Sequence, residues 1–149
     1  MAPTLGGSPL VRHAQHGGDD RQRGDGPLLD FACRHLQAGH GWLPFWMARL
    51  DEHAETIKAA LPELDHKPSE YVTGGRYFQS IEIPEGAKLT NATIDLVGDH
   101  VLMYASDYPH GESHFPESVA LVLDWEMDTE RKRKLLWDNA VQFYSRAPI

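Results

Sequence analysis

The sequence has one cysteine, a deficit of basic residues and no long apolar run. Cys33 is alone among 149 residues, so an intrachain disulfide is excluded and a reducing compartment is expected. The 22 acidic residues outnumber the 14 Lys and Arg residues, and this balance argues against a nucleic-acid partner. No apolar stretch approaches the roughly 18 residues of a membrane span, and no apolar signal core opens the chain. These absences predict a cytoplasmic protein that crosses no membrane.

Residues 1–26 differ in composition from the rest of the chain. They are rich in Gly, Asp, Arg and Gln, and almost no apolar residues recur at a regular spacing. Such a segment buries too little apolar surface to fold, so we expect a disordered or foreign leader. The folded region is then predicted at residues 27–149.

The apolar run Val101–Tyr104 is the strongest pattern in this region. It follows a Gly-Asp-His turn and leads into a polar segment with two prolines, which predicts a strand buried on both faces of a parallel sheet. Asp107 then lies at the carboxyl end of the strand. Chemistry in α/β folds gathers there, because the loops can carry polar groups while the strands are committed to packing. Asp107 is therefore a candidate site residue, and His110 and His114 follow in the same loop.

Two strand-loop-helix units precede this one. A short strand at 34–38 leads through the Gly39-His40-Gly41 turn into a helix with Trp42 and Trp46 on its apolar side. A long connection over 61–75 leads to a second strand at 77–83. A helix at 87–97 follows, with one side formed by Leu89, Ala92, Thr93, Leu96 and Val97.

The third unit continues with two helices. One is expected over 117–123, and the last one begins at a cap formed by Asp128 or Thr129. The basic run 131–134 lies in the last helix, where a solvated face is the expected role. Three such units in succession predict three parallel strands with right-handed crossovers.

Two separate motifs resemble one family in the expected order. The segment 105–110, together with 115–118 and 136–140, is similar to the last strand, loop and helix of the metal-dependent amidohydrolase-related family. The resemblance points to the branch of the aminocarboxymuconate-semialdehyde decarboxylase type. The segment 39–46 resembles the family's sixth strand-loop-helix unit, and the similarity covers about residues 27 to 146. It implies an α/β fold that is part of a TIM (β/α)8 barrel, namely the last three units, since a whole barrel needs about 200 or more residues.

The resemblance also implies a metal site. In the family a His-x-His pair on the first strand, a histidine on a middle strand and an aspartate on the last strand hold a divalent metal, for which Zn²⁺ is expected here. Asp107 matches that aspartate, as a metal ligand that can also carry a proton in catalysis. This sequence contains no His-x-His, and a catalytic Zn²⁺ takes three or more protein ligands. We therefore expect the chain alone to have no metal-dependent turnover.

Other candidate site residues surround this aspartate position. His40 and His110 are candidates for acid-base or positioning roles, with loop packing as an equal alternative for each. Gln37 stands where the family has a glutamate or histidine, and an amide has no titrating proton for general-base work. Gln37, Trp42 and Tyr108 are candidates for contact with a small-molecule substrate, although aromatic residues at such spacings more often belong to the core.

Three hypotheses follow for the function. The chain is the C-terminal part of an amidohydrolase-related enzyme, catalysing hydrolysis or nonoxidative decarboxylation when complete, or it is one half of a split barrel completed by a partner chain or by self-association. The third alternative is a non-catalytic α/β binding module. We favour the first, because nothing in the sequence is adapted to seal an open barrel edge.

Overall fold

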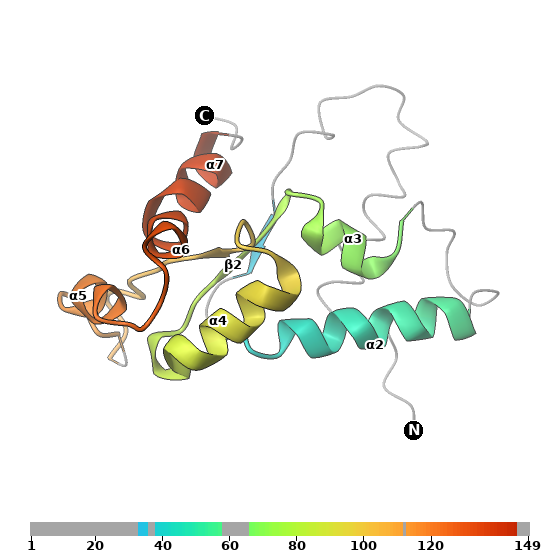
Figure 1. Cartoon of the computed structure of the whole chain (residues 1–149), viewed down its shortest axis with the longest axis horizontal. Coiled ribbons are helices and arrows are strands. Elements are labelled where there is room, and N and C mark those ends of the chain that lie inside the picture. Colours follow the sequence, from blue (N-terminus) through green and yellow to red (C-terminus); the bar gives the residue numbers. More distant parts are fainter. Residues whose placement is uncertain (1–32, 36–37, 58–65, 112, 146–149) are drawn as a thin grey trace.

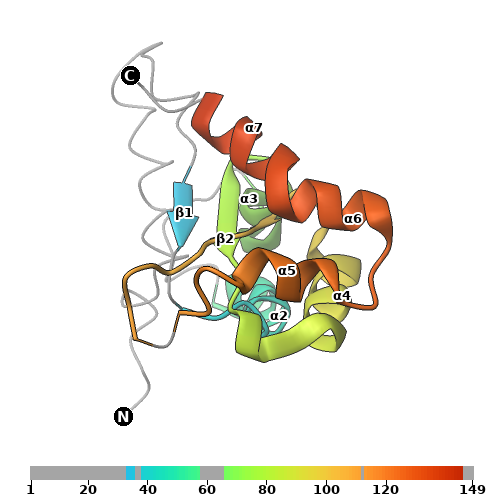
Figure 2. The same ribbon diagram turned by 90° about the vertical axis from the view of Figure 1, so that its left-hand side faces the viewer.

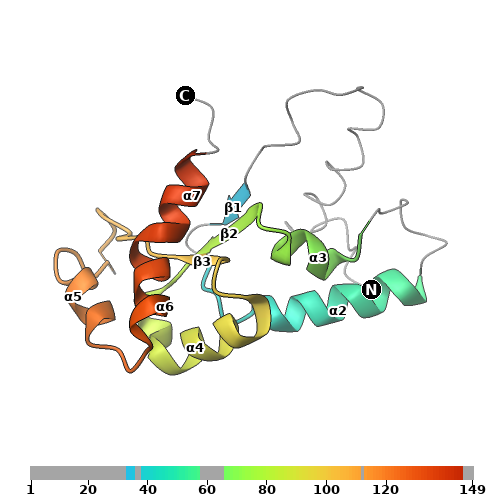
Figure 3. The same ribbon diagram turned by 45° about the horizontal axis from the view of Figure 1, so that its top comes forward.

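Three short parallel strands form the centre of the chain in a computed structural model, which describes residues 33–35, 38–57, 66–111 and 113–145. The strands are β1 (Cys33–His35), β2 (Tyr77–Ser80) and β3 (Leu102–Met103), and they lie side by side in the order β1-β2-β3 (Figure 3). Tyr77 of β2 pairs with Cys33 of β1, and Gln79 of β2 pairs with Leu102 of β3. The prediction of three parallel strands in succession is confirmed.

Helices connect the strands (Figure 1). Between β1 and β2 lie α2 (Leu43–Thr56) and α3 (Pro68–Thr73), and between β2 and β3 lie the 3-10 turn η4 (Ile83–Glu85) and α4 (Gly86–Val97). After β3 come α5 (Ser118–Leu123), α6 (Thr129–Arg133), the π-helical turn η5 (Lys134–Asp138) and α7 (Asn139–Ser145). Figure 2 shows α2, α3, α4 and α6 on the same side of the sheet. None of the helices in the described ranges is long and apolar enough to cross a membrane.

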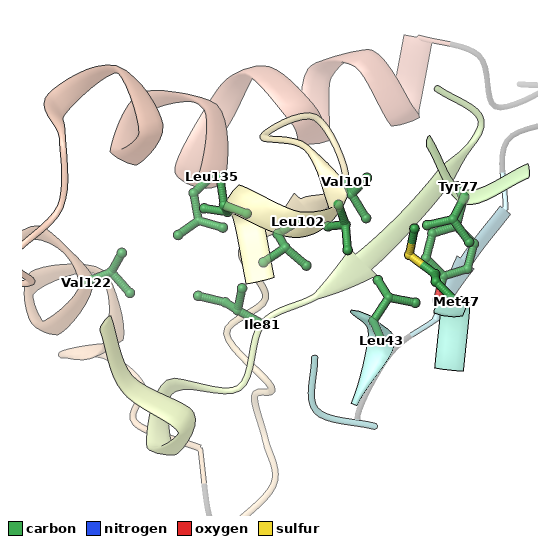
Figure 4. Close-up of a cluster of buried hydrophobic side chains, with 11 residues drawn as sticks. Leu43, Met47, Tyr77, Ile81, Val101, Leu102, Val122 and Leu135 are labelled. Carbon is green, nitrogen blue, oxygen red and sulfur yellow. The ribbon is translucent and has the colours of Figure 1, made fainter. Parts of the chain in front are cut away.

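The main core lies between the sheet and these helices. Figure 4 shows Tyr77 of β2, Leu102 of β3 and side chains of α2, α5 and η5 pointing into this one layer. Leu102 lies in this core and is 1% exposed, because the strand that carries it is covered by helices. The buried members of this core are Leu43, Met47, Val72, Tyr77, Ile81, Ile94, Val97, Val101, Leu102, Val122 and Leu135.

A second cluster covers the opposite face of the sheet. Phe78 follows Tyr77 in β2, and successive strand residues point to opposite faces. Phe78 packs there with Met103 of β3 and Phe143 of α7, and the Phe78 and Phe143 rings meet edge to face at 5.4 Å between centroids. The prediction that the third strand is buried on both faces is therefore confirmed, although β3 itself is only two residues long.

The connection expected over 61–75 contains a helix. Pro68 stands in the first turn of α3, where its missing N–H is not needed. The Glu70 carboxylate accepts the Lys67 N–H at 2.8 Å, and the Asp51 carboxylate of α2 accepts the N–H and hydroxyl of Ser69 at 2.9 and 2.6 Å. The prediction of a plain connection is wrong for residues 68–73, because these polar contacts supply partners for the first turn of a helix.

Other predicted boundaries shift by a few residues. The strand predicted at 77–83 ends at Ser80, because η4 begins at Ile83 with Pro84 in its first turn. The strand predicted at 34–38 is observed at 33–35, and residues 36–37 and 1–32 lie outside the described residues. In α4 the buried side carries Thr90, Thr93, Ile94 and Val97, while Leu89 and Leu96 are exposed. The predicted buried side of that helix is therefore confirmed at Thr93 and Val97 and wrong at Leu89 and Leu96.

The last helical segment is tied to α4. Asp128 caps α6 as predicted, since its carboxylate accepts the N–H groups of Glu130 and Arg131. Arg131 also pairs with Asp95 of α4 at 2.6 Å, and Lys134 pairs with Asp99 at 2.7 Å. The basic run is more than a solvated face, because two of its members join η5 and α6 to the preceding unit.

Candidate functional site

The loops that leave the three parallel strands begin at the same edge of the sheet. Parallel strands place their carboxyl ends together, so residues 38–42, 81–85 and 104–117 all start there. His40 lies in the first of these loops and Asp107 in the third. The sequence-based choice of these two positions therefore puts both on the edge where α/β folds bind ligands.

His40 is enclosed by the protein. Its side chain is 0% exposed, and the glycines on either side allow neighbours to approach closely. Gly39 has a φ of +66°, and a Cβ there would lie 2.7 Å from Oε1 of Glu85. A larger residue at position 39 would thus clash with Glu85 in a backbone conformation that favours glycine.

Glu85 holds the turn around His40. Its Oε2 lies 2.5 Å from His40 Nδ1 and accepts the backbone N–H of His40 at 2.7 Å. The N–H of Gly41 also faces this carboxylate, at 3.3 Å from Oε2. One carboxylate from η4 therefore joins the loop after β2 to the loop after β1.

Thr90 of α4 occupies the other side of the ring. Its Oγ1 lies 3.0 Å from His40 Nε2 and 2.8 Å from the carbonyl oxygen of Gly86. Burial lowers the pKa of His40, and the nearby Glu85 carboxylate opposes this change. Both ring nitrogens have partners within the protein, so His40 faces no open space in this structure.

Trp42 and Gln79 complete the lining of this loop. The Trp42 indole N–H donates to the carbonyl oxygens of Ala38 and Gly39 at 2.7 and 3.1 Å, and its ring packs against the main core. The buried Gln79 donates to the same Gly39 carbonyl at 2.7 Å. The Trp42 side chain thus contacts its own loop and the core. Packing of this kind was the alternative to substrate contact in the sequence analysis.

Asp107 lies in a more open loop. It has a φ of +56°, the one positive φ of a non-glycine residue in the described part of the chain. Its carbonyl oxygen accepts the N–H of His110 at 2.9 Å, so the two candidates share one turn. At the base of the loop the Tyr104 hydroxyl lies 2.6 Å from Ser118 Oγ, which connects the end of β3 to α5.

The side chains that follow Asp107 reach outward. Tyr108 is 66% exposed, and its ring lies 4.8 Å from that of Phe115, measured between centroids. His110 and His114 are exposed as well. Gln37, the remaining candidate, lies outside the described residues.

The described residues do not complete a metal site. Within ranges 33–35, 38–57, 66–111 and 113–145, no group of three or more His, Cys, Asp or Glu side chains is placed to hold a metal ion. A catalytic metal needs about three protein ligands, so Asp107 does not suffice with its described neighbours.

Glu85 and Thr90 were missed by the sequence analysis. A usable signal was present for Glu85, because this acidic residue follows the second parallel strand at the same edge as His40 and Asp107. Thr90 carried no such signal, since a threonine within an amphipathic helix is ordinary.

Comparisons with known proteins agree with this architecture. A family model described as Amidohydrolase matches residues 27–146. A search of the curated proteins finds no match. The chain resembles the crystal structure of 5-carboxyvanillate decarboxylase from Sphingomonas paucimobilis with a TM-score of 0.67 and 24% identity, over 91% of this chain and 38% of that one.

Two further solved structures contain a metal and a bound aromatic compound. A dihydroxybenzoic acid decarboxylase from Polaromonas sp. JS666, with manganese and 2-nitroresorcinol, gives a TM-score of 0.63 at 14% identity over 93% of this chain and 40% of that one. A mutant 5-carboxyvanillate decarboxylase from Novosphingobium aromaticivorans DSM 12444 contains manganese and 3-methoxy-4-hydroxy-5-nitrobenzoic acid. It gives a TM-score of 0.61 at 18% identity over 80% of this chain and 37% of that one. The chain thus spans about two fifths of the length of the structures it resembles, and at these identities the likeness shows the fold.

Proposed function

Since the chain belongs to the amidohydrolase family over residues 27–146, we propose that it forms the last three strand-helix units of a metal-dependent barrel enzyme. In this proposal Asp107 supplies one ligand to a divalent metal, and the other ligands come from residues beyond those described. The reaction is nonoxidative decarboxylation of an aromatic acid or hydrolysis. The decarboxylases among the structural neighbours favour decarboxylation, and the manganese in two of them supports a divalent ion without selecting Zn²⁺.

The backbone of Asp107 is the observation that carries this proposal. A non-glycine residue with a φ of +56° is held in a sparsely populated conformation, and such residues gather at functional sites. Aspartate tolerates this region better than most residues. Together with its place after β3, the conformation supports a role for the carboxylate rather than for packing.

His40 and His110 have different prospects in this enzyme. His40 is the acid-base candidate at the end of the first unit, and it acts only if Thr90 and Glu85 leave one ring nitrogen available. His110 shares a turn with Asp107 and is exposed, so it suits a role in orienting the carboxylate or a substrate. Tyr108, beside Asp107, is the aromatic surface that we assign to substrate contact.

The other hypotheses differ in what completes the molecule. A split barrel needs a partner chain, or a second copy of this chain, that pairs with the outer edges of β1 and β3. A binding module needs no metal and would keep Asp107 for another reason. Stoichiometric metal in an assembly separates the enzyme from the module, and the mass of the metal-bearing species separates one chain from two.

Native mass spectrometry on untagged protein from its own cells tests the proposal. We expect about one divalent metal per complete barrel, and we expect the purified 149-residue chain to hold no stoichiometric Mn²⁺ or Zn²⁺ and to turn over neither 5-carboxyvanillate nor dihydroxybenzoate. Asp107→Ala should release the metal from the assembly, because one ligand is lost.

Asp107→Asn serves as the matched variant, since it keeps the size and the tolerance of a positive φ while removing the charge. Asp107→Asn should also weaken the binding of the metal, whereas Asp128→Asn at the α6 cap should leave metal binding unchanged. Metal that survives Asp107→Ala, an assembly without any metal, or metal-dependent turnover by the isolated monomer would contradict the proposal.

A further inference from the structure

The proton on the His40 ring has two competing assignments. Glu85 Oε2 lies 2.5 Å from Nδ1, which calls for a hydrogen on that nitrogen. The backbone N–H of Glu82 points at the same Nδ1 from 3.3 Å, which calls for a lone pair there. A neutral imidazole carries one proton, so only one of these contacts is a hydrogen bond at a time.

The surroundings of Glu85 favour the first assignment. Its carboxylate also faces the backbone N–H groups of His40 and Gly41, at 2.7 and 3.3 Å from Oε2. Several donors around one carboxyl group suit an ionised acceptor rather than an acid that donates. An ionised oxygen 2.5 Å from a bare nitrogen lone pair would be repelled, whereas a proton between the two atoms makes the contact attractive.

We propose that Glu85 is the positioning residue for His40, which holds the proton on Nδ1 and leaves the lone pair of Nε2 directed at the hydroxyl of Thr90. The Thr90 hydroxyl has one proton and lies 3.0 Å from Nε2 and 2.8 Å from the Gly86 carbonyl, so it donates to Nε2 in this assignment and to Gly86 when Nε2–H is the donor. Glu85 thereby decides which ring nitrogen is basic, and Thr90 occupies that nitrogen while no substrate is present.

The catalytic meaning of this arrangement rests on the proposed function. In the complete enzyme, Nε2 is the ring nitrogen that accepts a proton, and the Thr90 hydroxyl can turn from Nε2 to the Gly86 carbonyl to release it. The tautomer itself depends only on the residues described here. It can therefore be tested without metal, substrate or turnover.

Long-range proton–nitrogen NMR on the ¹⁵N-labelled full chain reads which ring nitrogen of a histidine bears the proton. The His40 signals are assigned by their loss in His40→Gln, because the chain has nine histidines. We expect a protonated Nδ1 and an unprotonated Nε2 at neutral pH. In Glu85→Ala the Glu82 N–H becomes the best partner of Nδ1, so we expect the proton to move to Nε2 and donate to Thr90.

Two further variants keep the experiment decisive. Glu85→Gln retains an oxygen acceptor without the charge, so the proton should stay on Nδ1 while the pKa of His40 falls further. Glu82→Ala retains the competing backbone N–H and should leave both nitrogens unchanged. A wild-type proton on Nε2, or a proton that stays on Nδ1 in folded Glu85→Ala, would overturn the proposal.

The outcome is independent of the metal experiment. If the tautomer is as stated and no assembly contains metal, the positioning role stands and the enzyme proposal fails. If metal is present and the His40 proton lies on Nε2, the positioning role fails and the enzyme proposal stands.

Discussion

The loop after β1 and the loop after β3 leave the same edge of the sheet, yet they differ in the burial of their side chains. His40 in the first loop is 0% exposed and has partners at both ring nitrogens, whereas Tyr108 in the third loop is 66% exposed. A buried polar group must find its partners inside the protein, because leaving it unpaired is unfavourable. The first loop is therefore fixed by contacts within the protein, and the third leaves Tyr108 and His110 exposed to external contact.

The two loops also differ in what they contribute to stability. The contacts of Glu85 with His40 and Gly41 stabilise the fold whether or not a reaction takes place. The left-handed backbone conformation of Asp107 destabilises the fold, because it raises the energy of the folded state. Mutations in the two loops should consequently change stability by different amounts, and for Asp107 with the opposite sign.

Glu85→Ala should have the largest effect. It removes the acceptor of two backbone N–H groups and the partner of a fully buried ring, so we expect a loss of about 2–4 kcal/mol in the free energy of unfolding. Urea titration at neutral pH measures this loss. His110→Ala is the matching change in the third loop and should stay within about 0.5 kcal/mol, because the side chain is exposed. Equal losses in the two variants would break the comparison between the loops.

Thr90→Val and Thr93→Val should differ although the two residues lie one turn apart on α4. The Thr90 hydroxyl lies within hydrogen-bond distance of both His40 Nε2 and the Gly86 carbonyl, so its loss should destabilise by about 1–3 kcal/mol. Thr93 Oγ1 is buried and has no hydrogen-bond partner among the described residues, so a methyl group there should be neutral or stabilising by up to about 1 kcal/mol. Thermal unfolding of both variants checks the difference. A larger loss for Thr93→Val would mean that its hydroxyl has a bound water as partner.

The sequence predicts the fold better than it predicts this network. Parallel strands, the covering helices and the Asp128 cap follow from local patterns, because apolar runs, turn glycines and cap residues act within a few positions. The helix α3 was missed although two local signals were present, Pro68 in its first turn and Glu70 three positions after Lys67. What no local pattern records is the contact between Ser69 and Asp51, which lie 18 positions apart along the chain.

The site shows the same limit more strongly. Asp107 and His40 were found because each follows a strand or a turn, yet His40 and Glu85 are 45 positions apart and their pairing appears only in the folded chain. Burial of His40 likewise depends on α4 folding over the first loop. The exposure of Tyr108 and His110 in the third loop was not predicted either, because the sequence left core packing for Tyr108 and loop packing for His110 open as alternatives.

Asp107→Gly tests the effect of backbone conformation on stability in the third loop. Glycine adopts a φ of +56° without a steric penalty, and this gain exceeds its larger loss of chain entropy, so we expect stabilisation of up to about 1 kcal/mol. Ala105→Gly, two positions earlier and without a positive φ, should instead destabilise by about 0.5–1 kcal/mol. Differential scanning calorimetry on the two variants gives the sign. A Gly variant at 107 that is less stable than the parent would show that the carboxylate supports the fold.

The pH dependence of His40 should be the smallest effect, because burial and Glu85 act on it in opposite directions. Burial prevails and keeps the pKa of His40 below its ordinary value of about 6.5. Between these two pKa values the unfolded chain binds more protons than the folded chain, so the free energy of unfolding rises with pH in this window. The stability that neutral His40 provides is present above the ordinary pKa and is lost as the pH falls toward the folded one. Urea titrations of the parent and of His40→Gln, between about pH 5 and 7, isolate this contribution because the other histidines are common to both. The parent should lose more stability than the variant on acidification. Identical slopes of the free energy of unfolding against pH would mean that the ring of His40 is as accessible to solvent as the exposed side chains of the third loop.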